Sequence, residues 1–255
     1  MGLGKSAAVV IGNFPLGESD SVVTFFSRDF GKIRGVAKSA RRMPSKFGAA
    51  LELLTLGELV FFDTGRSDLV RIDHFDIVRP FAAVRDDLQR LGETAWSAEC
   101  IGRLTAERDP QRALYGLLVR ILRSVEAGVP PRRAAVVFGV RCVDALGHRL
   151  RLDVCVTCGR RPAPGRDGIA VDVEAGGVVC AACATDDLPR VAPSTVTAFS
   201  RLRTLAWDEA VRVRLGTAEA ELRALLDHHV SRLIGQPTRT TRFLREVARA
   251  PAGRS

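Results

Sequence analysis

The chain has 255 residues, a formal net charge of +9 and 46% hydrophobic residues, so it is long enough for one large or two ordinary domains with a substantial core. The charge favours an anionic partner, nucleic acid first and a membrane surface second, although a soluble protein can also be basic without such a partner. No apolar run approaches the roughly 18 residues of a membrane span, and the run at 7–11 is too short for a signal peptide. We therefore expect a cytoplasmic protein without a membrane partner, whose six cysteines are metal ligands or buried thiols.

Residues 1–80 are predicted to form a small β domain. Stretches rich in β-branched and aromatic residues indicate strands over 7–11, 21–26, 33–37, 51–63 and 69–78. Roughly five short strands without a convincing helix are typical of an OB-fold barrel. An SH3-like barrel fits the same periodicity almost as well.

A basic stretch from Gly31 to Lys46 covers one predicted strand and the loop that follows it. It has no acidic residue and six basic ones, Lys32, Arg34, Lys38, Arg41, Arg42 and Lys46. Cations in this density can neutralise several phosphates, so we predict a DNA-binding surface here, the alternative being a merely solvated face. Phe47 is predicted to stack on a base, although a place in the barrel core or rim is an equally good interpretation.

Helical periodicity replaces strand periodicity from Pro80 onward. Apolar residues spaced three and four apart predict several helices, the second of which is expected to open at Asp109 and Pro110. The helical domain is predicted in two parts, 81–153 and 185–255, separated by an inserted segment at 154–184. The fold class is therefore α+β.

The inserted segment contains two Cys-x-x-Cys pairs, formed by Cys155, Cys158, Cys180 and Cys183. Two residues between thiolates let one tight knuckle present both sulfurs to a single ion, and Gly159 allows the backbone angles of such a knuckle. We predict one structural Zn²⁺ per chain, with a metal-free reduced cluster as the alternative. Cys100 and Cys142 lie in helical stripes and are predicted to be buried small hydrophobes.

Common catalytic motifs do not occur in the sequence. It has no zinc-deaminase H-x-E element, no G-x-S-x-G elbow, no dinucleotide-binding glycine fingerprint and no H-E-x-x-H. We therefore expect a binding protein and not an enzyme.

Three short motifs give the chain a family resemblance. They are Gly17-Glu18-Ser19-Asp20, the turn Phe30-Gly31-Lys32, and Gly35-Val36-Ala37-Lys38-Ser39-Ala40-Arg41-Arg42. Together with the four-Cys insert and the closing segment from Gly235 to Leu244, they resemble the RecO family of bacterial DNA repair and recombination mediators, over nearly the whole chain. The resemblance implies an N-terminal OB-fold followed by a helical domain with a zinc module.

The resemblance also implies a function and partners. It implies binding of single- and double-stranded DNA, annealing of complementary strands, and help in loading RecA onto DNA covered by single-strand-binding protein. RecR is the implied complex partner, and the implied location is the bacterial cytoplasm, associated with the nucleoid. The basic run Arg239, Arg242 and Arg245, continued by Arg249, is a predicted secondary site for DNA or for the acidic tail of single-strand-binding protein, unless it is a solvated tail.

Two alternatives from other classes stay open at this point. One is a zinc-ribbon OB-fold protein that binds structured RNA or ribosomes. The other is a nuclease or other DNA-modifying enzyme whose active site has no recognisable motif.

Overall fold

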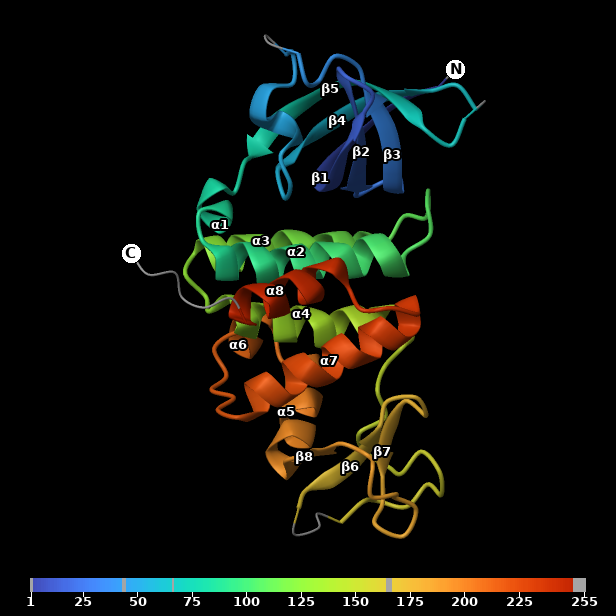
Figure 1. The fold of residues 1–255 in the computed structure, drawn as a ribbon, viewed down its shortest axis with the longest axis vertical. Helices are drawn as coiled ribbons and strands as arrows, with labels where there is room; N and C mark the ends of the chain where they lie inside the picture. The colour runs from blue at the N-terminus through green and yellow to red at the C-terminus, as the bar shows by residue number, and fades with distance from the viewer. Residues whose placement is uncertain (1, 43–44, 66, 164–166, 250–255) are drawn as a thin grey trace. The chain divides into compact units, whose positions relative to one another are not determined.

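The computed structural model describes the chain except for residues 1, 43–44, 66, 164–166 and 250–255, and the side chains of 247–249. The chain divides into two compact units, Met1–Gly128 and Val129–Ser255. Figure 1 shows strands at the start of the first unit and a separate small sheet in the second, so the α+β class is confirmed. Among the described residues, no helix is both long and apolar enough to cross a bilayer.

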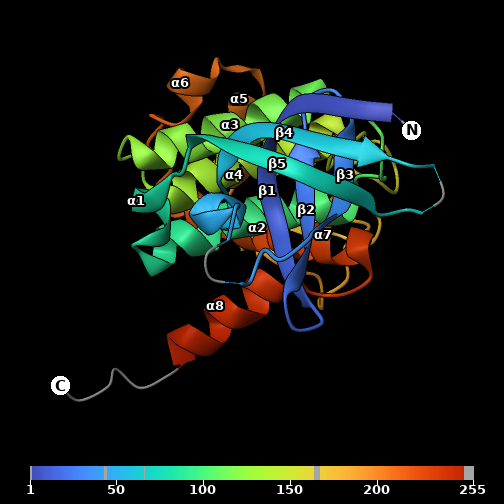
Figure 2. The same cartoon turned by 90° about the horizontal axis from the view of Figure 1, so that it is seen from above.

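Unit one begins with a closed five-stranded barrel. Its strands are β1 (Gly2–Leu16), β2 (Asp20–Ser27), β3 (Gly31–Ala37), β4 (Leu56–Asp63) and β5 (Val70–Arg79). They pair in the order β1-β2-β3-β5-β4, and β3 and β5 run parallel where the barrel closes. The predicted OB-fold is confirmed, and the barrel is visible from above in Figure 2.

Alternating side chains build the barrel core. Along β3 the residues alternate between buried and more exposed from Gly31 to Ala37, which is the pattern of a strand with one face toward a core. Inside the barrel the rings of Phe25 and Phe75 lie 5.0 Å apart between centroids. Two features extend beyond the predicted strands, since β1 is longer than 7–11 and a short 3₁₀ helix, η1 (Gly48–Leu51), precedes β4.

Three helices complete unit one, namely α1 (Ala82–Arg85), α2 (Leu88–Leu104) and α3 (Arg112–Glu126). The Asp87 carboxylate accepts a hydrogen bond from the N–H of Arg90 (2.7 Å) and so caps the start of α2. The predicted start of the next helix at Asp109 and Pro110 is wrong, because α3 begins at Arg112 behind Gln111.

Unit two packs α4 (Pro131–Ala145), α5 (Pro193–Thr204) and α7 (Ala218–Ile234) against one another, with α6 (Trp207–Ala210) and α8 (Arg239–Arg249) beside them. The Arg141 guanidinium on α4 donates to the carbonyls of Leu202 (3.2 Å) and Leu205 (2.5 Å), which are left unpaired where α5 ends. Helix α7 stops at Gly235, which adopts a left-handed φ of +80°. Cys100 in unit one and Cys142 in unit two are buried, as predicted, and burial raises the pKa of Cys142 to about 12.

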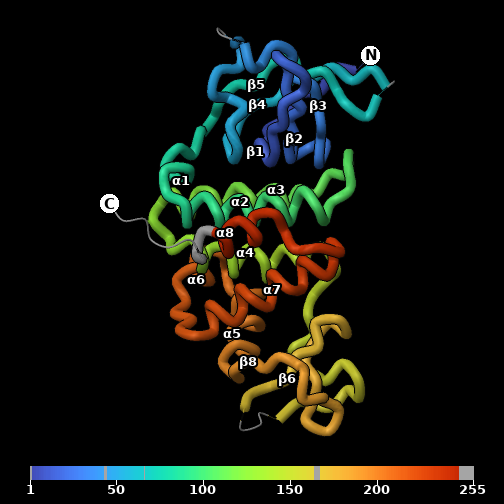
Figure 3. The backbone as a smooth tube through the Cα atoms, in the orientation of Figure 1, coloured from blue at the N-terminus to red at the C-terminus, as the bar shows by residue number. Residues whose placement is uncertain are grey.

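The inserted segment of unit two, together with the chain just beyond its predicted end at 184, forms a small three-stranded sheet. Its backbone is traced in Figure 3. Strand β6 (Ile169–Asp172) lies between β7 (Gly177–Val179) and β8 (Arg190–Val191). Strands β6 and β7 form an antiparallel hairpin between the two Cys pairs.

Candidate nucleic-acid interface and metal centre

The basic loop after β3 is fastened to the tip of the β1–β2 hairpin. The Asp20 carboxylate accepts a hydrogen bond from the Ser39 N–H (2.8 Å), and the Arg41 N–H donates to the Ser19 carbonyl (3.0 Å). The Arg41 guanidinium also donates to the Gly17 carbonyl (3.1 Å). These bonds hold the backbone of the loop, so its cations extend from a defined conformation.

Asp20 is the acidic anchor of this arrangement. The Ser39 N–H holds the pKa of Asp20 below its usual 3.8 against the opposing effect of burial, with further help from the Ser19 hydroxyl and the cations of Lys38 and Arg42. Asp20 therefore stays ionised at neutral pH and keeps Ser39 in its left-handed conformation, with φ at +56°. One carboxylate thus orders a loop that has no acidic residue of its own.

The loop half of the predicted interface carries exposed cations, namely Lys38, Arg41, Arg42 and Lys46. Lys46 donates to the Asp73 carbonyl (2.5 Å) and lies 4.9 Å from the centroid of the Phe47 ring. Residues 43–44, which belong to the same predicted stretch, are outside the described residues. The described part of the loop therefore presents positive charge that is ordered but accessible.

The strand half has a different role from the predicted phosphate contact. The Lys32 ammonium donates to the carbonyls of Gly102 (2.9 Å) and Thr105 (2.7 Å), which belong to the last turn and C-cap of α2. Burial lowers the pKa of Lys32, and the nearby carboxylate of Glu107 opposes this effect. Arg34 also faces Glu107, across 3.7 Å. Lys32 thus fastens the barrel to α2, while Arg34 stays exposed and shares its charge with a carboxylate.

Phe47 is not a stacking platform. Only 5% of its surface is exposed, and it packs into the barrel core, where the chain turns inward to begin η1. The prediction that its ring stacks on a base is therefore wrong, and its interpretation as a core residue holds. Phe14 is instead an exposed ring of the barrel, on β1 opposite Val22 of β2, the strand that begins at Asp20.

The C-terminal basic run, like the stretch from Gly31 to Lys46, includes a residue that helps to hold the fold together. Arg239, Arg242 and Arg245 on α8 are all exposed, but the Arg245 guanidinium also lies 3.2 Å from the carboxylate of the buried Asp227 on α7. The Thr241 hydroxyl donates to the same carboxylate (2.5 Å). Arg245 therefore contributes to fastening α8 to α7, and the side chain of Arg249 is outside the described residues.

The four predicted metal ligands gather at one point. The sulfurs of Cys155, Cys158, Cys180 and Cys183 all lie within 4.8 Å of one another. The Sγ atoms of Cys158 and Cys180 are 3.6 Å apart, close to the separation of about 3.8 Å that tetrahedral thiolates adopt around zinc at about 2.3 Å. Spacing and donor type therefore fit a tetrahedral metal ion.

Backbone hydrogen bonds shape both knuckles. The Gly159 N–H donates to the Cys155 carbonyl (2.9 Å), and Gly159 has the left-handed φ of +75° for which glycine was predicted. The second knuckle closes through the N–H groups of Cys183 and Ala184, which both donate to the Cys180 carbonyl (2.9 Å each). Each knuckle is thus pre-shaped to direct two sulfurs to one side.

The thiols have opposite acid–base tendencies within this cluster. Backbone N–H groups, that of Cys180 first, lower the pKa of Cys155 to about 6. Hydrogen bonds with the sulfurs of Cys180 and Cys158, together with their charge, raise the pKa of Cys183 to about 12. A divalent cation would remove the mutual repulsion of four thiolates, so the chemistry of the cluster also fits a metal.

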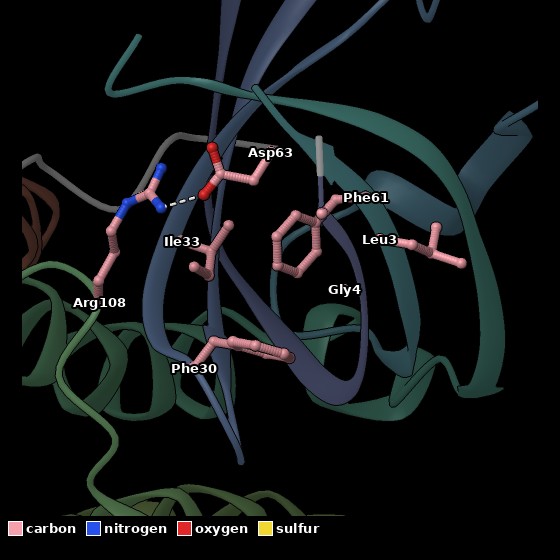
Figure 4. A pocket seen from close by; sticks show the side chains of 8 residues that line it. Leu3, Gly4, Phe30, Ile33, Phe61, Asp63 and Arg108 are labelled. Atoms are coloured by element: carbon pink, nitrogen blue, oxygen red, sulfur yellow. Dashed lines mark hydrogen bonds and ion pairs between the residues drawn. The ribbon is translucent and has the colours of Figure 1, made fainter. Parts of the chain in front are cut away.

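A small pocket that no sequence pattern indicates opens at one end of the barrel (Figure 4). It encloses about 230 Å³, with the rings of Phe30 and Phe61 packed edge to face at 5.3 Å. Gly4 makes room for Phe61, because a Cβ at this position would lie 2.3 Å from the ring. Arg108 forms an ion pair with Asp63 at the pocket. Its volume is below the roughly 300–1,000 Å³ of most ligand and cofactor pockets.

Comparison with known proteins covers almost the whole chain. Residues 1–81 match the family model described as Recombination protein O N terminal, and residues 85–242 match Recombination protein O C terminal. A DNA repair protein RecO from Anaeromyxobacter sp. (strain K) is 36% identical over 253 residues, which cover 95% of this chain and 96% of the relative. Proteins of the same name from Syntrophus aciditrophicus and Listeria monocytogenes are 25% and 26% identical over 250 residues, at a similar coverage of both chains. The chain therefore belongs to the RecO family.

Proposed function

We propose that this chain is a DNA repair and recombination protein that works by binding DNA and not by catalysis. The observation that carries the proposal is the ordered basic loop on an OB-fold barrel, with four exposed cations between Lys38 and Lys46. Membership of the RecO family supports the proposal, because the relatives bear the name DNA repair protein RecO.

The loop binds the phosphates of single- and double-stranded DNA, and the protein anneals complementary strands. Binding releases counterions from the phosphates, so affinity falls as salt rises. If each of the four cations neutralises one phosphate, the logarithm of the affinity for a single strand should fall with a slope of about −3 against the logarithm of salt concentration. Cations of the protein that lie between two complementary strands lower the repulsion between the two DNA backbones.

The finer steps of the proposal follow from the family resemblance. Together with RecR, the protein helps to load RecA onto single-stranded DNA covered by single-strand-binding protein, in the cytoplasm and at the nucleoid. Arg239 and Arg242 are suited to a second contact, with DNA or with the acidic tail of single-strand-binding protein, because both are exposed on α8. Arg245 is left out of this contact because it faces Asp227.

The proposed metal is one structural Zn²⁺ per chain. Cys155, Cys158, Cys180 and Cys183 would hold it, and four thiolates complete a tetrahedral coordination sphere. Such a site has no open position for a reactive water, which is consistent with a binding role. The ion would stabilise a short sheet that has little core of its own.

Charge reversal in the loop tests the proposed function. The variant Lys38→Glu, Arg41→Glu, Arg42→Glu should lose annealing of DNA coated with single-strand-binding protein, and its salt slope should fall by about 2. The matched control makes the same change in net charge at exposed positions elsewhere: Arg120→Glu, Arg212→Glu and Arg214→Glu. Equal annealing by the two variants would contradict the proposal, and so would tighter binding of structured RNA than of single-stranded DNA at matched salt.

A further inference from the structure

One row of side chains crosses the outer face of the barrel. Residues that pair directly across neighbouring strands point to the same side of a sheet. Phe14 of β1 pairs with Val22 of β2, Val22 with Val36 of β3, and Val36 with Arg71 of β5. Arg71 in turn pairs with Phe62 of β4, and its guanidinium lies 4.8 Å from the centroid of that ring. We name these five residues the outer row.

The outer row lies beyond the part of this face that the helices cover. Val9 and Phe26 also pair with each other on the outer face, and both are fully buried. Helix α2 packs there, since a Cβ on Gly102 would lie 3.4 Å from the Ile11 side chain. Farther along β1 the cover ends, and Phe14 is 52% exposed.

The outer row combines flat groups with neighbouring cations. Phe14 lies at one end, and the stacked pair of Arg71 and Phe62 lies at the other. Lys38 follows Val36 by two positions, so the basic loop leaves β3 beside the row. Three strand spacings of about 4.8 Å separate Phe14 from Arg71, which gives a path of about 14 Å around the curved surface of the closed barrel, suited to a few nucleotides.

Acidic residues on β4 and β5 limit where DNA can lie on the barrel. Glu58 of β4 pairs directly with Asp76 of β5, and His74 lies beside the carboxylates of Asp73 (2.9 Å) and Asp76 (3.6 Å). This part of β4 and β5 repels phosphate. A bound strand is therefore directed along the outer row and the basic loop, away from Glu58, Asp73 and Asp76.

We propose that the outer row binds unpaired nucleobases by stacking and gives the protein a preference for single strands over duplex. This inference rests on the proposed DNA-binding function and adds the residues that read the state of the strand. Phe14 takes one base, and the Arg71–Phe62 pair takes another. Duplex bases are already stacked on each other, so duplex binds through the loop cations alone. Stacking through the ring face leaves the pairing edges of the bases accessible to a complementary strand.

Phe14→Ala tests the inference in the full-length protein. Affinity for a short oligothymidine should fall about tenfold, in line with the usual loss when one stacking ring is removed, while affinity for a duplex of equal length stays within about twofold. The salt slope should not change, because no phosphate contact is lost. Phe14→Trp should restore binding and Phe14→Leu should not. Ile77→Ala is the control, as it removes another exposed apolar side chain of the barrel, 47% exposed on β5.

A fluorescent base analogue in the oligonucleotide gives a direct readout, because stacking quenches its emission. Quenching by the wild type that is reduced in Phe14→Ala supports the outer row. Equal losses of single-strand and duplex affinity in Phe14→Ala would overturn the inference. If the wild type binds DNA and Phe14→Ala loses no affinity at all, the inference is overturned as well. A wild type that binds neither form of DNA would instead overturn the proposed function.

Discussion

Substitution of Lys32 distinguishes most clearly between a structural role and a role in DNA binding. Lys32→Met keeps most of the apolar stem but removes the ammonium that donates to the carbonyls of Gly102 and Thr105. A hydrogen bond from a charged group is worth about 1.5–3 kcal/mol, and partial exposure and the cost of burying the charge reduce the sum of the two bonds. We expect a loss of about 2 kcal/mol in the free energy of unfolding of unit one.

Fluorescence can follow this loss within one unit. The chain has two tryptophans, and Trp96 lies buried in α2, the helix whose last turn is affected. In a Trp207→Phe background, the urea midpoint reported by Trp96 should fall by about 0.7–1 M upon Lys32→Met, for a slope of about 2–3 kcal/mol per M. DNA affinity and its salt slope should stay unchanged under conditions where the variant is folded. Weaker DNA binding with an unchanged urea midpoint would refute the structural role of Lys32 and would show that this residue contributes to DNA binding.

Three further predictions concern the anchors of the fold. Elemental analysis should find about one zinc per chain. The substitution Cys158→Ser should release the zinc and destabilise unit two. A metal-free protein that melts normally would contradict a structural role for the ion. Asp227→Asn should lower the stability of unit two by about 1–3 kcal/mol and expose α8 to protease, whereas Glu246→Gln on the exposed side of α8 should do neither. The folded pKa of Asp20 is lowered, so its contribution to stability is present above pH 3.8 and is lost as pH falls through the folded pKa. In an NMR titration, the chemical shift of the Ser39 amide should change as the Asp20 carboxyl is protonated. A Ser39 amide that does not respond would contradict the role of Asp20 in holding the loop.

Local pattern was enough to predict much of the fold. The alternation along β2 and β3 specified their inward faces, because a strand with one buried face repeats every two residues. The helical stripes placed α4, α5 and α7, and the spacing of the Cys pairs placed four sulfurs together. In each case the signal is a regular repeat or a short motif in the sequence.

Phe14 was missed because its orientation depends on a bulge. The register of β1 against β2 shifts between Val10 and Gly12, so Ile11 is an extra residue in the ladder. A one-residue insertion exchanges the two faces of the strand beyond it. Without the bulge, Phe14 would share the inward face of Ala8 and Val10, and a pattern of alternation alone would assign it to the core. A single sequence carries no clear signal for such a shift.

The remaining errors have a common cause, which is a partner far away in the chain. Lys32 meets carbonyls about 70 residues later, and nothing in its local sequence distinguishes it from Lys38. Phe47 could be placed in the core or at the rim from sequence, and the turn into η1 decided for the core. Tertiary contacts of this kind override local propensity, so they require the fold to be known first.

The stretch from Gly31 to Lys46 is therefore better understood as two segments than as one basic patch. Gly31 has a left-handed φ of +66°, and a Cβ there would lie 2.0 Å from the Asp109 carbonyl, so only glycine lets the loop after α2 approach β3. Lys32 then secures the end of α2 from the same turn. After Ala37 the chain leaves the sheet; its backbone and Arg41 are bonded to the β1–β2 tip, and Lys46 is bonded to the Asp73 carbonyl on β5. The motif Phe30-Gly31-Lys32 is thus accounted for by packing, whereas the cations of the loop that begins at Lys38 are exposed, and this loop is the segment that we propose binds DNA.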